Sequence, residues 1–339
     1  MAKRTQPTSS DVARLAQVSQ SAVSRTFTPG ASVSERTRKK VLNAAKALGY
    51  RPNALARSLT KRNSHLIGVV LGYMDNTFYT QVLKLLSQRL QSEGYHLMLF
   101  LSDPGDVDNV LHQILQYRVA GILLASATLS SDLANECEAI GIPVVLFNRS
   151  VRGMPTNTVT SDNYKGGRLV GKFLADCGHT RIAYIAGAPD SSTNKERQAG
   201  FLEALAEHGL KCFAYAEGNY QFEGATRAAR DLFSGKRKNA RPDAVFVAND
   251  HMALAVMDVL RFELSLKVPE DVSVIGYDNV TQAAWPTYDL TTVEQRASPM
   301  VQASVDILLD QIKNPRLQHN HVVIPGDLIV RGSTRKIPS

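Results

Sequence analysis

The spacing of apolar residues divides the chain into two parts. From about residue 64 onward, short apolar runs typical of strands alternate with amphipathic helical patterns. The predicted strands are Leu66–Leu71, His96–Leu101, Gly121–Ala125, Val144–Phe147, Ile182–Ala186, Ala244–Ala248 and Val272–Tyr277. The clearest helical patterns, each ended by a glycine, are Thr80–Ser92, Tyr164–Cys177 and Arg197–His208. This alternation predicts an α/β fold of doubly wound parallel sheets, and the length allows two of them.

The first fifty residues predict three short helices instead. Thr8 begins a capping box, Ser19 can cap a second helix from Gln20 to Phe27, and Ser34 can cap a third that ends at Gly49. Their expected inward faces are Val12, Leu15 and Ala16, then Val23 and Phe27, then Val41, Ala44, Ala45 and Leu48. Two helices joined by a short turn and followed by a third are typical of a helix-turn-helix unit.

Charge is concentrated in this first part. Residues 1–62 carry 13 Lys and Arg against only Asp11 and Glu35, whereas the whole chain is +8, so the remainder is slightly negative. A basic block on a near-neutral body indicates that one end binds a polyanion. On the second predicted helix, Gln20 can pair with adenine and Arg25 with guanine in the major groove of DNA.

Residues 50–62 leave two interpretations open. Pro52 can begin a helix of about two turns, too short to be stable alone in water. Such a basic segment with Leu55 and Leu59 could fold upon DNA and insert a leucine into the minor groove. It could equally be a flexible linker.

Other functional classes find little support in the sequence. Three widely spaced cysteines favour a reducing cytoplasm over a disulfide framework. The eight histidines lack metal-ligand spacing, and the phosphate loop Gly-x-x-x-x-Gly-Lys is missing, so we expect neither metal nor cofactor. A signal peptide and an apolar run of membrane-spanning length are also missing, so no membrane association is expected and the predicted location is cytoplasmic.

An ordered series of motif positions runs through residues 8–71. It comprises Asp11-Val12-Ala13, Ala16, Val18-Ser19, Val23-Ser24-Arg25, Val33-Ser34, Thr37-Arg38, Val41, Leu48-Gly49-Tyr50, Pro52-Asn53, Ala56-Arg57-Ser58-Leu59 and Ile67-Gly68-Val69. This series resembles the lactose/galactose repressor family of bacterial transcription regulators. Later matches at Thr160–Asn163, Ala248–Ala253, Ile275–Asp278 and Leu290–Val293 extend the resemblance over nearly the whole chain. Gln17, Ala22 and Thr28 depart from the family's usual glycine, hydroxyl residue and asparagine.

The resemblance implies a domain organisation and a set of DNA contacts. It implies a head over 1–51, a hinge helix or linker over 52–63, and a two-lobed core like a periplasmic sugar-binding protein. One lobe would combine 64–160 with 293–322, and the other 161–292 with 323–339. Base reading is implied for Gln20, Ser21 and Arg25, backbone contact for Thr8, Ser19 and Asn53, and minor-groove insertion for Leu59.

Polar residues follow several predicted strands, at the sheet edge where α/β proteins bind ligands. They are Asn148-Arg149, Asn249-Asp250 and Asp278, and Arg197 opens a later helix. By resemblance, the effector-binding residues are Tyr73, Phe78, Asn148, Arg149, Arg197, Tyr220, Asn249 and Asp278. Phe78 could instead be core, and Tyr79 could face a partner subunit. The possible effectors are sugars and polyols. They also include sugar acids and sugar phosphates, because of the positive charges of Arg149, Lys195 and Arg197.

The sequence thus predicts an effector-controlled, DNA-binding regulator, not an enzyme. We expect it to repress genes of carbohydrate uptake or catabolism. It would bind a near-palindromic double-stranded operator as a homodimer. The basic tail after Val330 has no leucine heptads, which favours a dimer over a tetramer. The alternative is a solute-binding protein or carbohydrate enzyme with a basic arm, for which Asp250 and Asp278 could form a catalytic pair.

Overall fold

The computed structural model describes residues 7–28, 30–51, 64–72, 74–103, 106–125, 130–151, 153–235 and 240–337. The chain divides into two compact units, and the boundary between them in the sequence follows residue 64. Asn53, Leu59 and Tyr73 lie outside the described residues, as does the whole segment 52–63. The two interpretations of that segment therefore both remain.

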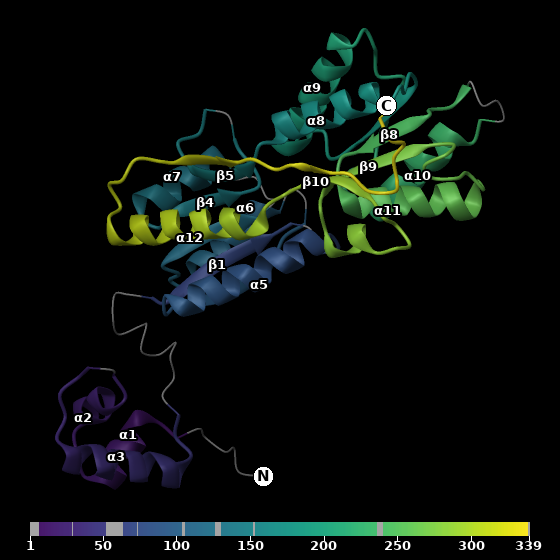
Figure 1. Cartoon of the computed structure of the whole chain (residues 1–339). Coiled ribbons are helices and arrows are strands. Elements are labelled where there is room, and N and C mark those ends of the chain that lie inside the picture. Colours follow the sequence, from purple (N-terminus) through teal and green to yellow (C-terminus); the bar gives the residue numbers. More distant parts are fainter. Residues whose placement is uncertain are drawn as a thin grey trace. The chain divides into compact units, whose positions relative to one another are not determined.

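The first unit is a three-helix head formed by α1 (Ser9–Ala16), α2 (Gln20–Thr26) and α3 (Glu35–Leu48) (Figure 1). The predicted capping box is present, because the Thr8 hydroxyl accepts from the amide of Asp11 and the Asp11 carboxylate accepts from the amide of Thr8. The buried core consists of Val12, Ala13, Ala16, Val23, Val41, Ala44 and Ala45.

Two residues that were expected to face inward are exposed instead. Leu15 is 54% exposed, because α1 packs through the adjacent stripe that includes Ala13, and Leu48, the last residue of α3, is 37% exposed. Gln17, which replaces the family's usual glycine, has φ 55° and ψ 49° and caps the C-terminus of α1. That left-handed conformation is the one in which glycine is favoured, which explains the common residue at this position.

The second unit contains two six-stranded sheets, each the centre of one lobe. Lobe 1 has the strand order β11-β5-β4-β3-β1-β2, with all neighbours parallel. Its strands are β1 (Leu66–Leu71), β2 (His96–Leu101), β3 (Gly121–Ala125), β4 (Val144–Phe147), β5 (Asn157–Ser161) and β11 (His321–Ile324). Its helices are α5 (Thr77–Ser92), α6 (Val107–Leu115), α7 (Ser131–Ala139) and α12 (Ala297–Lys313). Helices α5 and α12 pack against each other beside the sheet (Figure 1).

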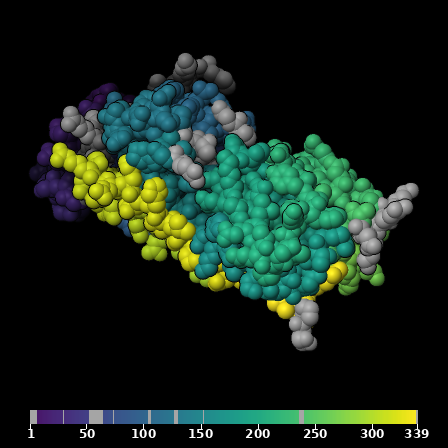
Figure 2. All heavy atoms as spheres, turned by 90° about the horizontal axis from the view of Figure 1, so that it is seen from above, coloured from purple at the N-terminus to yellow at the C-terminus, as the bar shows by residue number. Residues whose placement is uncertain are grey.

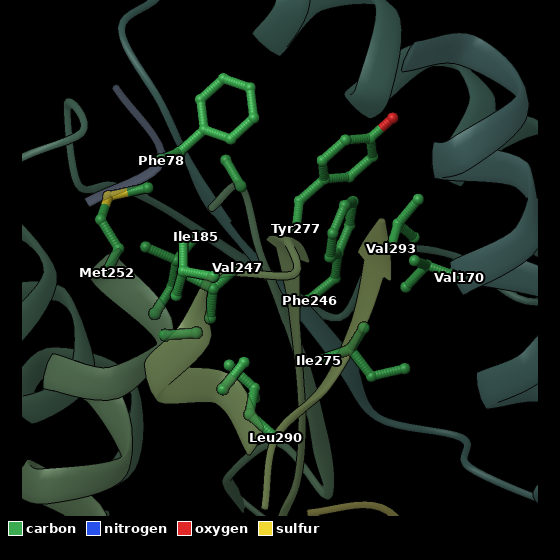
Figure 3. Close-up of a cluster of buried hydrophobic side chains, with 14 of the residues drawn as sticks. Phe78, Val170, Ile185, Phe246, Val247, Met252, Ile275, Tyr277, Leu290 and Val293 are labelled. Atoms are coloured by element: carbon green, nitrogen blue, oxygen red, sulfur yellow. The ribbon is translucent and has the colours of Figure 1, made fainter. Parts of the chain in front are cut away.

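Lobe 2 repeats this architecture with the order β12-β10-β9-β8-β6-β7, in which the β10–β12 pair is antiparallel. Its strands are β6 (Ile182–Ala186), β7 (Ala214–Glu217), β8 (Ala244–Val247), β9 (Ser273–Asp278), β10 (Thr291–Glu294) and β12 (Leu328–Ile329). Its helices are α8 (Asn163–Asp176), α9 (Ser192–Glu207), α10 (Phe222–Phe233) and α11 (Asp250–Asp258), which continues into a wider turn, Val259–Glu263; a short turn of helix spans Thr281–Ala284. Side chains such as Ile185, Phe246 and Ile275 fill its core (Figure 3).

The chain passes between the lobes after β5, after β10 and after β11. The last passage lies in the C-terminal segment, which runs along both lobes (yellow in Figures 1 and 2). The boundaries expected at 160/161, 292/293 and 322/323 each fall inside one of these strands, so the crossings lie a few residues later. All three strands are short, and β5 and β10 are rich in threonine, so their sequences carry little apolar periodicity.

Candidate functional site

The DNA-contact candidates of the head lie on its surface. Thr8, Ser19, Gln20, Ser21 and Arg25 are all exposed. Ser19 caps α2 and its hydroxyl is 2.9 Å from that of Ser21, while Gln20 Nε2 donates to Ser9 Oγ over 2.9 Å. Arg25 Nε lies 3.4 Å from the Ser21 carbonyl, which is a weak contact. Exposed side chains held so lightly can exchange these bonds for contacts with nucleic acid.

The polar side chains at the strand ends of both lobes converge on one cavity. It has an empty volume of about 300 Å³ and is lined by Asn76, Tyr79, Asn148, Arg149, Thr193, Arg197, Tyr220, Asn249 and Asp278. Six of the eight residues expected from sequence lie in this lining.

Phe78, which was expected to contact a ligand, does not line the cavity. Asn76 caps α5 by accepting a hydrogen bond from the amide of Phe78, and the Phe78 ring is buried in the large hydrophobic cluster of the core (Figure 3). There it stacks on Phe147, with ring centroids 6.5 Å apart. The next residue, Tyr79, lines the cavity instead, and Tyr73 lies outside the described residues.

Arg197 is the most enclosed charged group of the cavity, with only 2% of its surface exposed. Its Nε donates to Asn163 Oδ1 over 2.9 Å and its Nη1 to the carbonyl of Ala248 over 2.5 Å. The guanidinium lies 3.6 Å from the ring centroid of Tyr277, and Nη2 lies 3.9 Å from Asp278 Oδ1. Arg197 therefore ties α9 to α8, to the residue after β8 and to β9, as well as lining the cavity.

Asp278 accepts hydrogen bonds from both lobes. Asn76 Nδ2 donates to its Oδ2 over 2.9 Å and Gln295 Nε2 to its Oδ1 over 2.6 Å. Burial raises the pKa of Asp278, and the positive charge of Arg197 opposes that shift. Sequence reasoning missed Asn76 and Gln295, although an asparagine directly before a helical pattern is a recognisable capping signal for the former.

Asp250 cannot act as the second acid of a catalytic pair in the cavity. It is fully buried and does not line the cavity. Its two oxygens accept from the hydroxyl of Thr292 (2.6 Å) and from the amide of Val280 (2.9 Å). Among the described residues, no group of three His, Cys, Asp or Glu is placed to bind a metal ion.

Asp250 should make stability depend on pH. Burial, and then the charge of Asp278, raise the pKa of Asp250 to about 7. In the unfolded chain an aspartate has a pKa of about 3.9, so between pH 4 and 7 the folded protein holds a proton that the unfolded chain releases. The free energy of unfolding should therefore fall as the pH rises through this window. In Asp250→Asn, urea unfolding at pH 5, 6, 7 and 8 should show a flatter profile; equal slopes in both proteins would contradict the assignment.

Arg149 and its neighbours bridge the lobes. Arg149 Nη1 donates to Thr193 Oγ1 over 2.7 Å, and its guanidinium lies 5.6 Å from the ring centroid of Tyr220. Beside it, the amide of Ser150 donates to Ser192 Oγ over 3.0 Å. A ligand in this cavity would meet groups from both lobes at once. Its binding is therefore coupled to how the lobes are arranged.

Tyr220 forms one wall of the cavity from a strained backbone position. Its φ is 61°, and its hydroxyl lies 3.1 Å from that of Thr193. A Cβ at Gly187 would lie 2.1 Å from the Tyr220 ring, so only glycine lets the ring approach so closely. Thr193 itself stands in the polar run Ser191–Asn194 at the start of α9, where a ligand contact could have been suspected from sequence.

No helix in the described part of the chain has the length and apolar character needed to cross a membrane.

Known proteins match both units. The family profile of bacterial regulatory proteins of the lacI family matches residues 8–53, and that of a periplasmic binding protein-like domain matches residues 172–334. The ribose operon repressor of Escherichia coli K12 is 34% identical over 332 residues, covering 96% of this chain and 99% of the relative.

Solved structures agree with these matches. A lac repressor dimer bound to operator and the anti-inducer ONPF superposes with a TM-score of 0.85 at 28% identity, covering 98% of this chain and all of the other. A LacI-family regulator from Enterococcus faecium with bound ribose gives a TM-score of 0.72 at 25% identity, over 79% of this chain and 98% of the other. With 34% identity to a curated relative over nearly the full length of both chains, this protein belongs to the lacI family of bacterial regulatory proteins.

Proposed function

We propose that this protein represses carbohydrate uptake or catabolism genes by binding a near-palindromic operator, under the control of a sugar-like effector bound between the core lobes. One observation carries the proposal. The chain joins a head with an exposed, polar second helix to a core whose cavity is lined by polar side chains from both lobes. The relatives named above are repressors and regulators, which favours a regulator over an enzyme. Reading DNA in a bacterium requires a cytoplasmic location.

The proposed DNA contacts follow from exposure and chemistry. Gln20, Ser21 and Arg25 would read base edges in the major groove, and Thr8 and Ser19 would contact phosphates through hydroxyl groups at helix N-termini. Arg38 Nη1 donates to the carbonyl of Thr26 and so fixes α3 against the end of α2. Asn53 and Leu59 remain predictions from the family resemblance.

The proposed effector contacts are the polar side chains of the cavity. Asp278, Asn148 and Asn249 offer hydrogen bonds, Arg197 and Arg149 offer guanidinium groups, and Tyr220 offers a ring for the apolar face of a sugar; Tyr73 remains a prediction. An effector that favours one lobe arrangement changes operator affinity. Operator binding must then change effector affinity by the same factor.

A homodimer fits the exposed apolar surface of the core. Leu99 and Leu101 on edge strand β2 are 40% and 58% exposed, and in lobe 2 Phe222, Phe262 and Trp285 are 44%, 75% and 50% exposed. Exposed apolar side chains of this size are available to contact a protein partner. A second copy would also supply the two-fold symmetry that two operator half-sites require. The solved lac repressor structure is such a dimer on operator.

Replacing Arg25 with alanine should remove operator selectivity and leave salt-sensitive residual binding. The loss of a bidentate contact to guanine costs about 1–3 kcal/mol of discrimination, while the phosphate contacts of the head persist. The measurement compares affinities for genomic operator fragments and for random duplex at one salt concentration, with light scattering of the complex to count two chains per operator.

Arg14→Ala is the matched control, because Arg14 is an exposed arginine on α1 whose removal changes the charge equally. It should lower both affinities by a similar factor. A specific-to-random ratio that is unchanged in Arg25→Ala would exclude base reading by Arg25. A wild-type chain that binds no duplex would overturn the proposed function itself.

A further inference from the structure

The first residues of α1 and α2 are in contact in the head. Thr8 caps α1 and Ser19 caps α2, so Ser9 and Gln20 are each the first residue of a helix. The two helices pack against each other through the buried core of the head. This packing brings Ser9 and Gln20 together although they lie 11 positions apart, and Gln20 Nε2 donates to Ser9 Oγ over 2.9 Å. A side chain of one helix thus holds a side chain of the next.

This bond distinguishes Gln20 from the other two residues that we expect to read bases. The hydroxyl of Ser21 contacts that of Ser19, and Arg25 Nε contacts the carbonyl of Ser21, so both contacts stay within α2 and its cap. Gln20 is tied to a different helix. That helix is fixed in its turn, because α1 begins with a capping box and buries one face in the core of the head. The bond therefore ties the Gln20 side chain to a rigid neighbour.

The amide of Gln20 has enough hydrogen-bonding atoms to keep this bond while it contacts a base. Nε2 of a glutamine carries two protons, and Oε1 has two lone pairs. When one proton is donated to Ser9, the other proton and Oε1 remain for a base edge. Adenine needs that pair, because its N6 group donates and its N7 accepts in the major groove. Contact with adenine therefore does not require the bond to Ser9 to break.

We propose that Ser9 is a positioning residue for base recognition, because its hydroxyl orders the Gln20 side chain before DNA binds. The inference rests on the proposed function, in which Gln20 contacts a base edge. A long side chain that is free in solution loses conformational entropy when an interface fixes it. Ser9 already restricts Gln20, so less entropy is lost when the matched base pair is bound. A mismatched base pair does not fix Gln20, so Ser9 should favour the matched operator selectively.

The test starts with a pool of randomised DNA duplexes, from which the full chain selects those that it binds. The positions whose base preference is lost in Gln20→Ala are those that Gln20 reads, and Arg25→Ala identifies its own positions in the same way. Affinities are then measured for the selected duplex and for duplexes changed at one base pair. In Ser9→Ala, the preference for adenine at the Gln20 position should fall about three- to tenfold, as expected for one hydrogen bond. The preference at the Arg25 positions should stay unchanged.

Three further variants separate positioning from a general effect on the head. Ser9→Thr keeps the hydroxyl and should retain most of the preference, whereas Ser10→Ala, at the exposed neighbour on α1, should leave it unchanged. In the Gln20→Ala background, Ser9→Ala should change each affinity by less than about 1.5-fold, because its effect passes through Gln20. Ser9 and Ser10 lie outside the buried core of the head, so these variants should fold.

Equal losses of affinity on every duplex in Ser9→Ala, or a loss that persists in the Gln20→Ala background, would make Ser9 a direct backbone contact and overturn the inference. A wild-type preference in Ser9→Ala would overturn it too, as would a Gln20→Ala variant that loses no base preference. In each of these cases a wild-type chain that enriches a near-palindrome leaves the proposed function standing. A wild-type chain that enriches no sequence overturns the proposed function, and the inference with it.

Discussion

Replacing Arg197 with methionine is expected to lower the free energy of unfolding of the core by about 3–5 kcal/mol and to abolish the effector response. The loss of stability comes from the buried partners of Arg197, which keep their polar groups but lose its positive charge. Asp278, 3% exposed, would keep its carboxylate with no cation nearby except Arg149, and the Ala248 carbonyl would lose its donor. The sequence assigned Arg197 to the effector site, and its contacts show that it is also part of the fold.

A double variant separates the two roles. Arg197→Met/Asp278→Asn removes the stranded charge, so it should recover part of the stability lost in Arg197→Met while the effector response stays lost. The control is Lys195→Met on the same helix, which is exposed and should change stability by less than about 0.5 kcal/mol. Urea unfolding measures all three variants. A loss below about 1 kcal/mol in Arg197→Met, or a wild-type effector response, would refute this account.

Replacing Gly200 with alanine should destabilise lobe 2 by about 3 kcal/mol or more. Helices α8 and α9 cross with their backbones in contact. A Cβ at Gly200 would lie 2.0 Å from the carbonyl oxygen of Tyr164, and one at Gly167 would lie 2.1 Å from that of Arg197. Because these neighbours are backbone atoms, no side-chain rotation relieves the clash. The helices must separate, and Arg197 on α9 moves with them.

The single tryptophan, Trp285, lies in lobe 2 and gives a fluorescence signal for its unfolding in urea. Gly235→Ala is the control, since the nearest heavy atom to its added Cβ lies 3.9 Å away. This variant should unfold like the wild type within about 0.5 kcal/mol. Gly200→Ala and Gly235→Ala with equal transition midpoints would show that α8 and α9 can shift at little cost.

The sequence by itself determined those parts whose signals are local. Capping residues fixed the helices of the head, so Thr8, Ser19 and Ser34 cap α1, α2 and α3 as predicted. Apolar runs fixed seven strands to within one residue at either end. Polar residues placed directly after such strands, Asn148 and Asp278 among them, identified the sheet edge at which the cavity lies.

Only the tertiary structure decided what depends on contacts distant in sequence. Asn76 meets Asp278 across 202 positions, and no local pattern marks that pairing. Strands β5 and β10 were not predicted, because their sequences are polar. Their threonines are nevertheless buried, and Thr292, for example, donates a hydrogen bond to Asp250. The choice between Phe78 and Tyr79 at the cavity depended on which face of α5 the sheet covers. Local sequence sets propensity, spacing and caps, but side-chain direction and burial are fixed by the surfaces that pack against them.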